Sequence, residues 1–154
     1  MKKINKNYFK KTLSKFVTGI TVVATNKNSI YYGKTINSFS SLSLSPPLVL
    51  FSLDIKSSQL NIFKNSNTVS INILSKNQKN ISDNFAKKNP DWNNIDYNIL
   101  KNGNPNIKNC VSNLDCKITN KIKKGDHIIF ICEVINVSIN YKLKPLIYFN
   151  SRYI

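Results

Sequence analysis

The chain has 154 residues, of which 41% are hydrophobic and 10% aromatic, enough for one ordinary core, so residues 1–154 are predicted to form a single domain. Its net charge is +16, but the lysines are scattered and no stripe of aromatics offers a base-stacking platform, which argues against a nucleic-acid-binding protein. No apolar run reaches the roughly 18 residues of a membrane span, and no signal-peptide core follows the basic start, so no membrane association is expected.

The first third of the chain predicts a helix followed by strands. Residues 8–17 place apolar side chains at helical spacing between lysines, which indicates a short amphipathic helix. Residues 20–25 are almost all β-branched, and the turn-forming residues 26–29 lead back through residues 30–33, which predicts a hairpin. Residues 48–53 form another apolar run, and the two prolines before it suit the beginning of a strand.

The middle of the chain is less regular. Residues 57–64 fit a helix, and residues 68–74 alternate as a strand does. Residues 78–87 predict a further helix. Residues 88–109 are rich in Asn, Asp, Pro and Gly and are predicted to be a long surface loop.

The last third is predicted to be β-structure. Residues 113–121 and 127–140 indicate two strands joined by a turn at residues 123–126, and residues 145–153 close the chain. Many short strands with few helices favour an antiparallel barrel, because closure hides edges that would pair with other chains. The predicted fold is therefore mainly β, a closed or nearly closed antiparallel barrel with a few short helices.

Several common catalytic and metal-binding motifs are absent. The chain has no P-loop, GxGxxG, GxSxG or HExxH motif, and its seven acidic residues argue against a paired-carboxylate hydrolase. Cys110, Cys116 and Cys132 form no CxxC pair and His127 is the single histidine, so no metal site is expected. The cysteines are interpreted as reduced core thiols, which fits a cytoplasmic protein.

A stretch rich in hydroxyl groups lies between the predicted hairpin and the next strand. Residues 35–43 carry six hydrogen-bonding side chains in nine positions. Such a run presents donors and acceptors that suit a heterocycle or a phosphate. The same composition also fits a polar surface turn, so these residues by themselves leave both interpretations open.

Residues 33–50, GKTINSFSSLSLSPPLVL, closely resemble the signature of the flavin reductase-like proteins. Residues 9–25, 84–86, 125–134 and 145–153 resemble further blocks of that family, in the same order. The resemblance implies the FMN-binding split-barrel fold, a closed antiparallel Greek-key β-barrel. It is closest to the reductase components of two-component flavin-dependent monooxygenases, which are homodimers that use NADH or NADPH to reduce a dissociable flavin.

The resemblance implies which residues contact the flavin. Those expected along its ring and ribityl chain are Thr35, Ile36, Asn37, Ser38, Ser40 and Ser41. Those expected near its phosphate are Ser52, Leu53, Asp54 and Ser57. The carboxylate of Asp54 would repel a phosphate, so capping the following helix is an alternative role for it. Lys34 and Gln59 depart from the family pattern, and Lys34 would either face the phosphate or point to solvent.

Four more residues are expected near the nicotinamide or at the flavin edge. The resemblance places His127, in Gly-Asp-His, where it would position the nicotinamide rather than act as an acid or base. Arg152 would grip a dinucleotide phosphate or make a dimer contact. Phe85 and Tyr148 would exclude water from the flavin edge or serve as core aromatics.

The implied function is that of an NAD(P)H:flavin oxidoreductase. Hydride would pass from NADH or NADPH to FMN or FAD in a cleft between two barrels, and the reduced flavin would go to a partner monooxygenase. The main alternative is a non-catalytic flavin-binding protein or electron carrier on the same fold. An oxidase on the related pyridoxamine-phosphate-oxidase barrel is disfavoured by the signature in residues 35–41.

Overall fold

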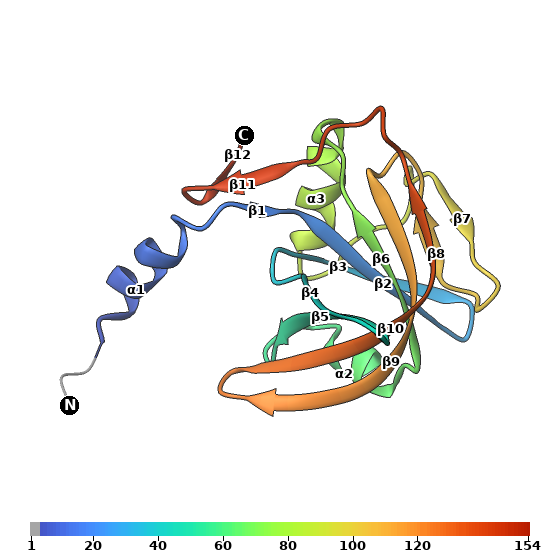
Figure 1. Ribbon diagram of the computed structural model, residues 1–154, viewed down its shortest axis with the longest axis horizontal. Coiled ribbons are helices and arrows are strands. Elements are labelled where there is room, and N and C mark those ends of the chain that lie inside the picture. The colour runs from blue at the N-terminus through green and yellow to red at the C-terminus, as the bar shows by residue number, and fades with distance from the viewer. Residues whose placement is uncertain (1–3) are drawn as a thin grey trace.

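β-Strands make up most of the regular secondary structure in this computed structural model, which describes residues 4–154 (Figure 1). Residues 1–3, the start of the basic N-terminal segment, lie outside the described residues. The main sheet has seven antiparallel strands, which in spatial order are β3 (Ile30–Ile36), β2 (Thr21–Lys27), β6 (Thr68–Ile73), β9 (Ser112–Lys124), β10 (His127–Ile139), β5 (Pro47–Asp54) and β4 (Ser40–Leu44). The prediction of a mainly β, antiparallel fold is confirmed.

Two smaller sheets and a few short helices complete the structure. The small sheets contain β1 (Thr18–Gly19), β11 (Ile147–Phe149) and β12 (Arg152–Tyr153), and separately β7 (Tyr97–Ile99) and β8 (Pro105–Ile107). The helices are α1 (Lys6–Leu13), α2 (Leu60–Asn65) and α3 (Lys79–Ala86), with a 3-10 turn at Lys76–Gln78. Within the described part of the chain, none of these helices combines the length and apolar character needed to span a membrane.

Two predicted hairpins are confirmed, and each turns at residues with positive φ. Asn28 and Ser29 join β2 to β3, and their φ angles of 52° and 64° fit the two-residue turn that suits twisted strands. Gly125, with a φ of 57°, lies in the turn between β9 and β10, where glycine adopts this conformation without strain. The second hairpin carries His127 to a position opposite Asp54, at the end of β5.

The main sheet has two free edges, β3 and β4. Among residues 4–154 no backbone pairing joins these edges, so the sheet is not closed by hydrogen bonds between strands. One side chain instead connects the link between β3 and β4 to β5. Ser38 Oγ accepts a hydrogen bond from the Ser52 N–H and donates one to the Ser52 carbonyl, both at 3.0 Å. Residues 37–39 are therefore held against β5.

The core consists of two clusters. The larger is enclosed by the main sheet, where alternate strand residues point inward, and the fully buried rings of Phe51 and Phe130 stack with centroids 4.9 Å apart. The second core cluster contains Phe85 of α3. All three cysteines are free and buried, as predicted for core thiols, and burial raises the pKa of Cys110 and Cys132 to about 12.

The prediction of one long surface loop over residues 88–109 is wrong in its second half. This segment contains β7 and β8, which pair with each other, and Ile107 of β8 is fully buried. Trp92 packs against Phe85 with ring centroids 4.6 Å apart. These strands escape sequence reasoning because each has only three residues, too few to establish the alternation of a strand among the many asparagines.

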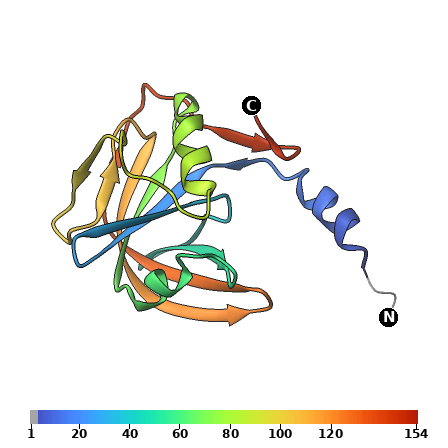
Figure 2. The same ribbon diagram turned by 180° about the vertical axis from the view of Figure 1, so that it is seen from behind.

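The predicted N-terminal helix forms, but it is shorter than expected and none of its residues is buried. α1 ends at Leu13, and Asn5 Oδ1 caps its beginning by accepting from the N–H groups of Asn7 and Tyr8 at 2.9 and 3.1 Å. Figures 1 and 2 show α1 projecting away from the sheets. Its apolar side chains, including Phe9 and Leu13, are exposed.

Replacing Gly33 with alanine is expected to lower the free energy of unfolding by about 1–3 kcal/mol. A Cβ on Gly33 would lie 2.7 and 2.8 Å from two ring carbons of Phe85 and 3.0 Å from Trp92. Because the Phe85 ring is fully buried, it cannot move aside without disturbing the second cluster. Urea unfolding checks this, with Gly19→Ala as the control, since a Cβ on Gly19 meets no atom within 4 Å. Equal stabilities of the two variants would contradict the packing at Gly33.

Candidate functional site

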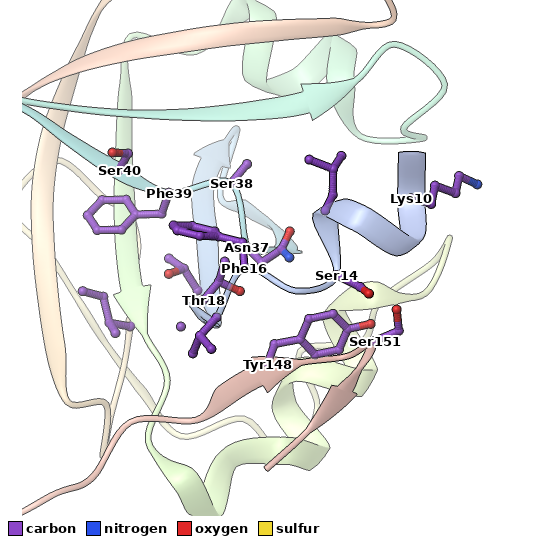
Figure 3. Close-up of a pocket in the computed structure, with 15 residues that line it drawn as sticks. Lys10, Ser14, Phe16, Thr18, Asn37, Ser38, Phe39, Ser40, Tyr148 and Ser151 are labelled. Atoms are coloured by element: carbon purple, nitrogen blue, oxygen red, sulfur yellow. The ribbon is translucent and has the colours of Figure 1, made fainter. Parts of the chain in front are cut away.

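The larger of two adjoining cavities has a volume of about 980 Å³ and is called here the aromatic cavity (Figure 3). Phe16, Phe39 and Tyr148 form part of its wall, and Asn37 and Ser38 add polar groups. Its lining residues are Lys10, Leu13, Ser14, Phe16, Val17, Thr18, Gly19, Thr21, Asn37, Ser38, Phe39, Ser40, Ile73, Tyr148 and Ser151. The cavity therefore lies between the α1–β1 connection, the β3–β4 link and β11.

A smaller cavity of about 210 Å³, called here the polar cavity, shares Asn37 and Ser38 with the aromatic cavity. Lys34 is also part of its wall. Because β5 pairs with β10, the ends of these strands meet beside the end of β3. The structure thus brings together nine residues that were predicted from the sequence, namely Thr35, Ile36, Asn37, Ser38, Ser52, Leu53, Asp54, Ser57 and His127.

The remaining predicted residues lie elsewhere. Ser40 and Tyr148 line the aromatic cavity, and Arg152 lines a separate cavity beside it. Ser41 is exposed on β4 and lines neither the aromatic nor the polar cavity. Phe85 is fully buried in the second core cluster, so the expected contact with the flavin edge is not supported. Its alternative interpretation as a core aromatic fits, because its ring packs on Trp92 and beside Gly33.

Besides Ser38, further polar side chains of the polar cavity bond to the protein itself. Lys34 Nζ donates to the carbonyls of Ala86 and Lys87 at the C-terminal end of α3, both at 3.0 Å. The ammonium group is thus held at the end of α3 while the side chain lines the polar cavity, and partial burial lowers the pKa of this group. Thr35 Oγ1 donates to the Ser82 carbonyl at 2.7 Å, and Asp54 Oδ1 accepts from the Lys56 N–H at 2.8 Å.

Each cavity also has a buried hydroxyl group without a partner. Ser57 Oγ in the polar cavity and Thr18 Oγ1 in the aromatic cavity make no hydrogen bond within the described residues. Buried polar atoms are rarely left unpaired, so an unpaired hydroxyl in a cavity is suited to a ligand. Sequence reasoning did not single out Thr18. The feature that could have indicated it is its position within residues 9–25, a block that resembles the family.

His127 makes a hydrogen bond to its neighbour in the β9–β10 turn. Its Nδ1 lies 2.7 Å from Asp126 Oδ1, so the Nδ1–H tautomer donates to the carboxylate and leaves Nε2 free to accept. This hydrogen bond is the main cause that lowers the pKa of Asp126. Among residues 4–154, no three His, Cys, Asp or Glu side chains gather as metal ligands would.

His127→Ala is expected to raise the pKa of Asp126 toward its ordinary value, because the hydrogen bond that favours the carboxylate is lost. Because the pKa of Asp126 is lowered in the folded chain, the contact stabilises the fold at pH values above the pKa that this carboxyl has in the unfolded chain. That contribution is lost as the pH falls through the folded-state pKa. Carboxyl titration by NMR measures the shift, and an unchanged Asp126 pKa in the variant would contradict the contact.

The chain matches the family model for the flavin reductase like domain over residues 13–154. The reductase subunit HsaB of a flavin-dependent monooxygenase from Mycobacterium tuberculosis is 32% identical, over 97% of this chain and 82% of the relative. The FMN reductase (NADH) SmoA of Agrobacterium fabrum is 33% identical, over 87% of this chain and 77% of the relative.

A solved structure agrees with these relatives. The NADH:FAD oxidoreductase SgcE6 of Streptomyces globisporus, in complex with NAD and FAD fragments, superimposes with a TM-score of 0.92. It is 28% identical, and the match covers 97% of this chain and 91% of the other. Because the family model covers almost the whole chain, the protein belongs to the flavin reductase-like family.

Proposed function

We propose that the protein is an NAD(P)H-dependent flavin reductase that supplies reduced FMN or FAD to a partner monooxygenase. The observation that carries this proposal is the polar cavity, where nine predicted residues meet beside the aromatic cavity. HsaB is named as a monooxygenase reductase subunit, and SmoA as an NADH-dependent FMN reductase, which supports the activity and the partner. The complex of SgcE6 with NAD and FAD fragments supports the use of both nucleotides.

The residues present fit a flavin. Ser57, with its unpartnered buried hydroxyl, and Ser52 would hold the phosphate in the polar cavity. Asn37 and Ser38 lie where the two cavities meet and would bind the polar edge of the ring, with Thr35 and Ile36 beside them and Ser40 on the aromatic side. When bound, the flavin supplies the ring that accepts hydride from the nicotinamide coenzyme.

The aromatic cavity suits the nicotinamide coenzyme. The part-buried rings of Phe39 and Tyr148 would exclude water from the reacting face, and the Thr18 hydroxyl would donate to a carbonyl of the ligand. His127 would position the coenzyme from the wall of the adjoining polar cavity, and its hydrogen bond to Asp126 fixes the ring orientation. Alignment of the two cofactors is the main contribution of the chain, since hydride transfer from the coenzyme to the flavin needs no protein base.

We also propose that the protein is a homodimer. Residues directly opposite on paired strands share a face of the sheet, so Val137 faces the same side as the buried residues Leu114 and Ile71. Val137 is nevertheless 63% exposed, because β5 pairs only with the first half of β10. This open apolar end of the core and the uncovered apolar face of α1 are the surfaces that a second copy would cover.

Val137→Asp is expected to convert the dimer into a monomer, because a carboxylate buried without a partner in the interface costs several kcal/mol. Ser138→Asp is the matched control, since it adds the same charge to the adjacent exposed residue on the opposite face of β10, where its cross-strand partner is the uncharged Asn113. Sedimentation equilibrium measures the masses. A monomeric wild-type protein, or a Val137→Asp variant that stays dimeric, would refute the proposed interface.

Three further properties belong to this proposal. The first is that the described residues form a single domain. The second is that the barrel of this domain is completed by the hydrogen bonds of Ser38 to Ser52, which hold the β3–β4 link against β5, rather than by pairing of the strand edges. The protein is located in the cytoplasm, where its three buried cysteines would remain reduced.

Oxidation of NADH or NADPH in the presence of added FMN or FAD tests the proposed activity. A rate that is proportional to protein concentration and saturates with both nucleotides is expected. The alternative is a flavin carrier, for which the protein would bind flavin tightly but leave NADH and NADPH unoxidised.

A further inference from the structure

A third cavity of about 480 Å³ lies between α3 and the β11–β12 hairpin. It shares Tyr148 and Ser151 with the aromatic cavity, so the two cavities adjoin. The residues that line it are Lys79, Asp83, Tyr148, Ser151, Arg152 and Tyr153. Two cations and two aromatic rings thus lie next to the cavity proposed for the nicotinamide coenzyme.

More positively charged than negatively charged side chains line this third cavity. Arg152 is exposed, and among residues 4–154 no hydrogen bond or ion pair engages its guanidinium group. Lys79 Nζ lies 3.7 Å from Asp83 Oδ2 in an exposed pair, and 5.7 Å from the centroid of the Tyr153 ring. Asp83 is the single carboxylate among the lining residues. All the N–H donors of the Arg152 guanidinium group are therefore available, in the planar arrangement that binds two phosphate oxygens at once.

The hairpin holds Arg152 in a defined place. Asn150 and Ser151 form its two-residue turn with φ angles of 50° and 59°. The Asn150 N–H donates to the Ser14 carbonyl at 2.9 Å, and Lys15 Nζ donates to Asn150 Oδ1 at 2.9 Å. The turn that precedes Arg152 is therefore tied to the segment that follows α1.

The two tyrosines supply the apolar surface. Their rings meet edge to face with centroids 5.5 Å apart, and the Tyr153 hydroxyl is fixed by Ser82 Oγ at 2.9 Å and Asp83 Oδ1 at 3.0 Å. An aromatic ring with a fixed orientation suits a flat base, and an unpaired guanidinium suits a phosphate. A nucleotide combines both groups.

We infer that this third cavity binds the phosphate-bearing adenosine end of an adenine dinucleotide, with Arg152 as the phosphate ligand. The inference rests on the proposed function, because two adenine dinucleotides, NAD(P)H and FAD, are candidates for the adjoining cavities. Lys79 adds a second positive charge, whereas Asp83 opposes the phosphate and limits the affinity.

Titration calorimetry with ADP, in the absence of flavin, tests the inference. Arg152→Ala is expected to raise the Kd for ADP about tenfold, because charge-assisted hydrogen bonds to phosphate are lost. Asp83→Asn is expected to lower the Kd up to about fivefold, since it removes a surface charge of the wrong sign. Lys76→Ala is the control for net charge, because Lys76 is exposed outside the three cavities, and its Kd is expected to stay within about twofold.

The dinucleotide that uses the cavity is identified by competition. ADP that raises the KM for NADH in an FMN-supported reaction assigns the cavity to the nicotinamide coenzyme. ADP that weakens binding of FAD but not of FMN assigns it to the flavin. An ADP affinity that does not change on Arg152→Ala, or that falls on Asp83→Asn, overturns the inference. Absence of flavin reduction by the wild-type protein would instead refute the proposed function, whatever the ADP titration gives.

Discussion

Ser38→Ala is expected to weaken flavin binding at least about tenfold and to lower the stability of the fold. The Ser38 hydroxyl is bonded to both the N–H and the carbonyl of Ser52, and the variant leaves these part-buried groups unpaired. Each unpaired group costs about 1–3 kcal/mol. Because Asn37 and Ser38 line both cavities at their junction, release of this link would move the groups proposed to bind the ring.

Equilibrium dialysis with FMN and with FAD measures the affinity, and thermal unfolding measures the stability. Ser43→Ala is the matched control, since its hydroxyl accepts only the local Ser45 N–H and lies outside both cavities. An unaltered flavin Kd in Ser38→Ala would contradict the placement of the flavin at the β3–β4 link.

His127→Ala is expected to raise the KM for NADH or NADPH about tenfold to a hundredfold, the loss of one well-placed polar contact. The limiting rate is expected to change much less, because a positioning residue contributes through binding. Asp126→Asn should shift KM in the same direction by a smaller factor, since the amide oxygen can still accept from Nδ1.

Steady-state kinetics at saturating flavin separate the two parameters. A large fall in the limiting rate with an unaltered KM would show that His127 acts in the transition state rather than in binding the coenzyme, which contradicts a positioning role. Equal kinetics of the wild-type protein and the alanine variant would remove His127 from the site altogether.

The elements that could be predicted from sequence are those whose signal is local. The β-branched run in β2 and the turn at Asn28 and Ser29 predict a hairpin without reference to the rest of the chain. The residues of the polar cavity lie in three separate segments, and composition left their role open. Their resemblance to a known family indicated that Thr35 and Ser57 belong to one site, and the pairing of β5 with β10 explains how the strand ends meet.

The features that sequence reasoning missed depend on contacts between distant segments. Thr18 and Phe16 gain a role only because the α1–β1 connection lies across from the β3–β4 link. Lys34 bonds to the end of α3, a partner 52 residues away that no local pattern reveals. The exposure of α1 is likewise invisible in its periodicity, because an amphipathic pattern shows that a face is apolar but not what covers it.

Anaerobic rapid mixing of the flavin-loaded protein with NADH, and separately with NADPH, is the most direct test of the central claim. The absorbance of the oxidised flavin is followed over a single turnover. Rapid bleaching by at least one of the two donors, at a rate that saturates with donor concentration, is the predicted result. Flavin that binds at the site but keeps its absorbance with both donors would contradict the reductase activity and favour a flavin carrier.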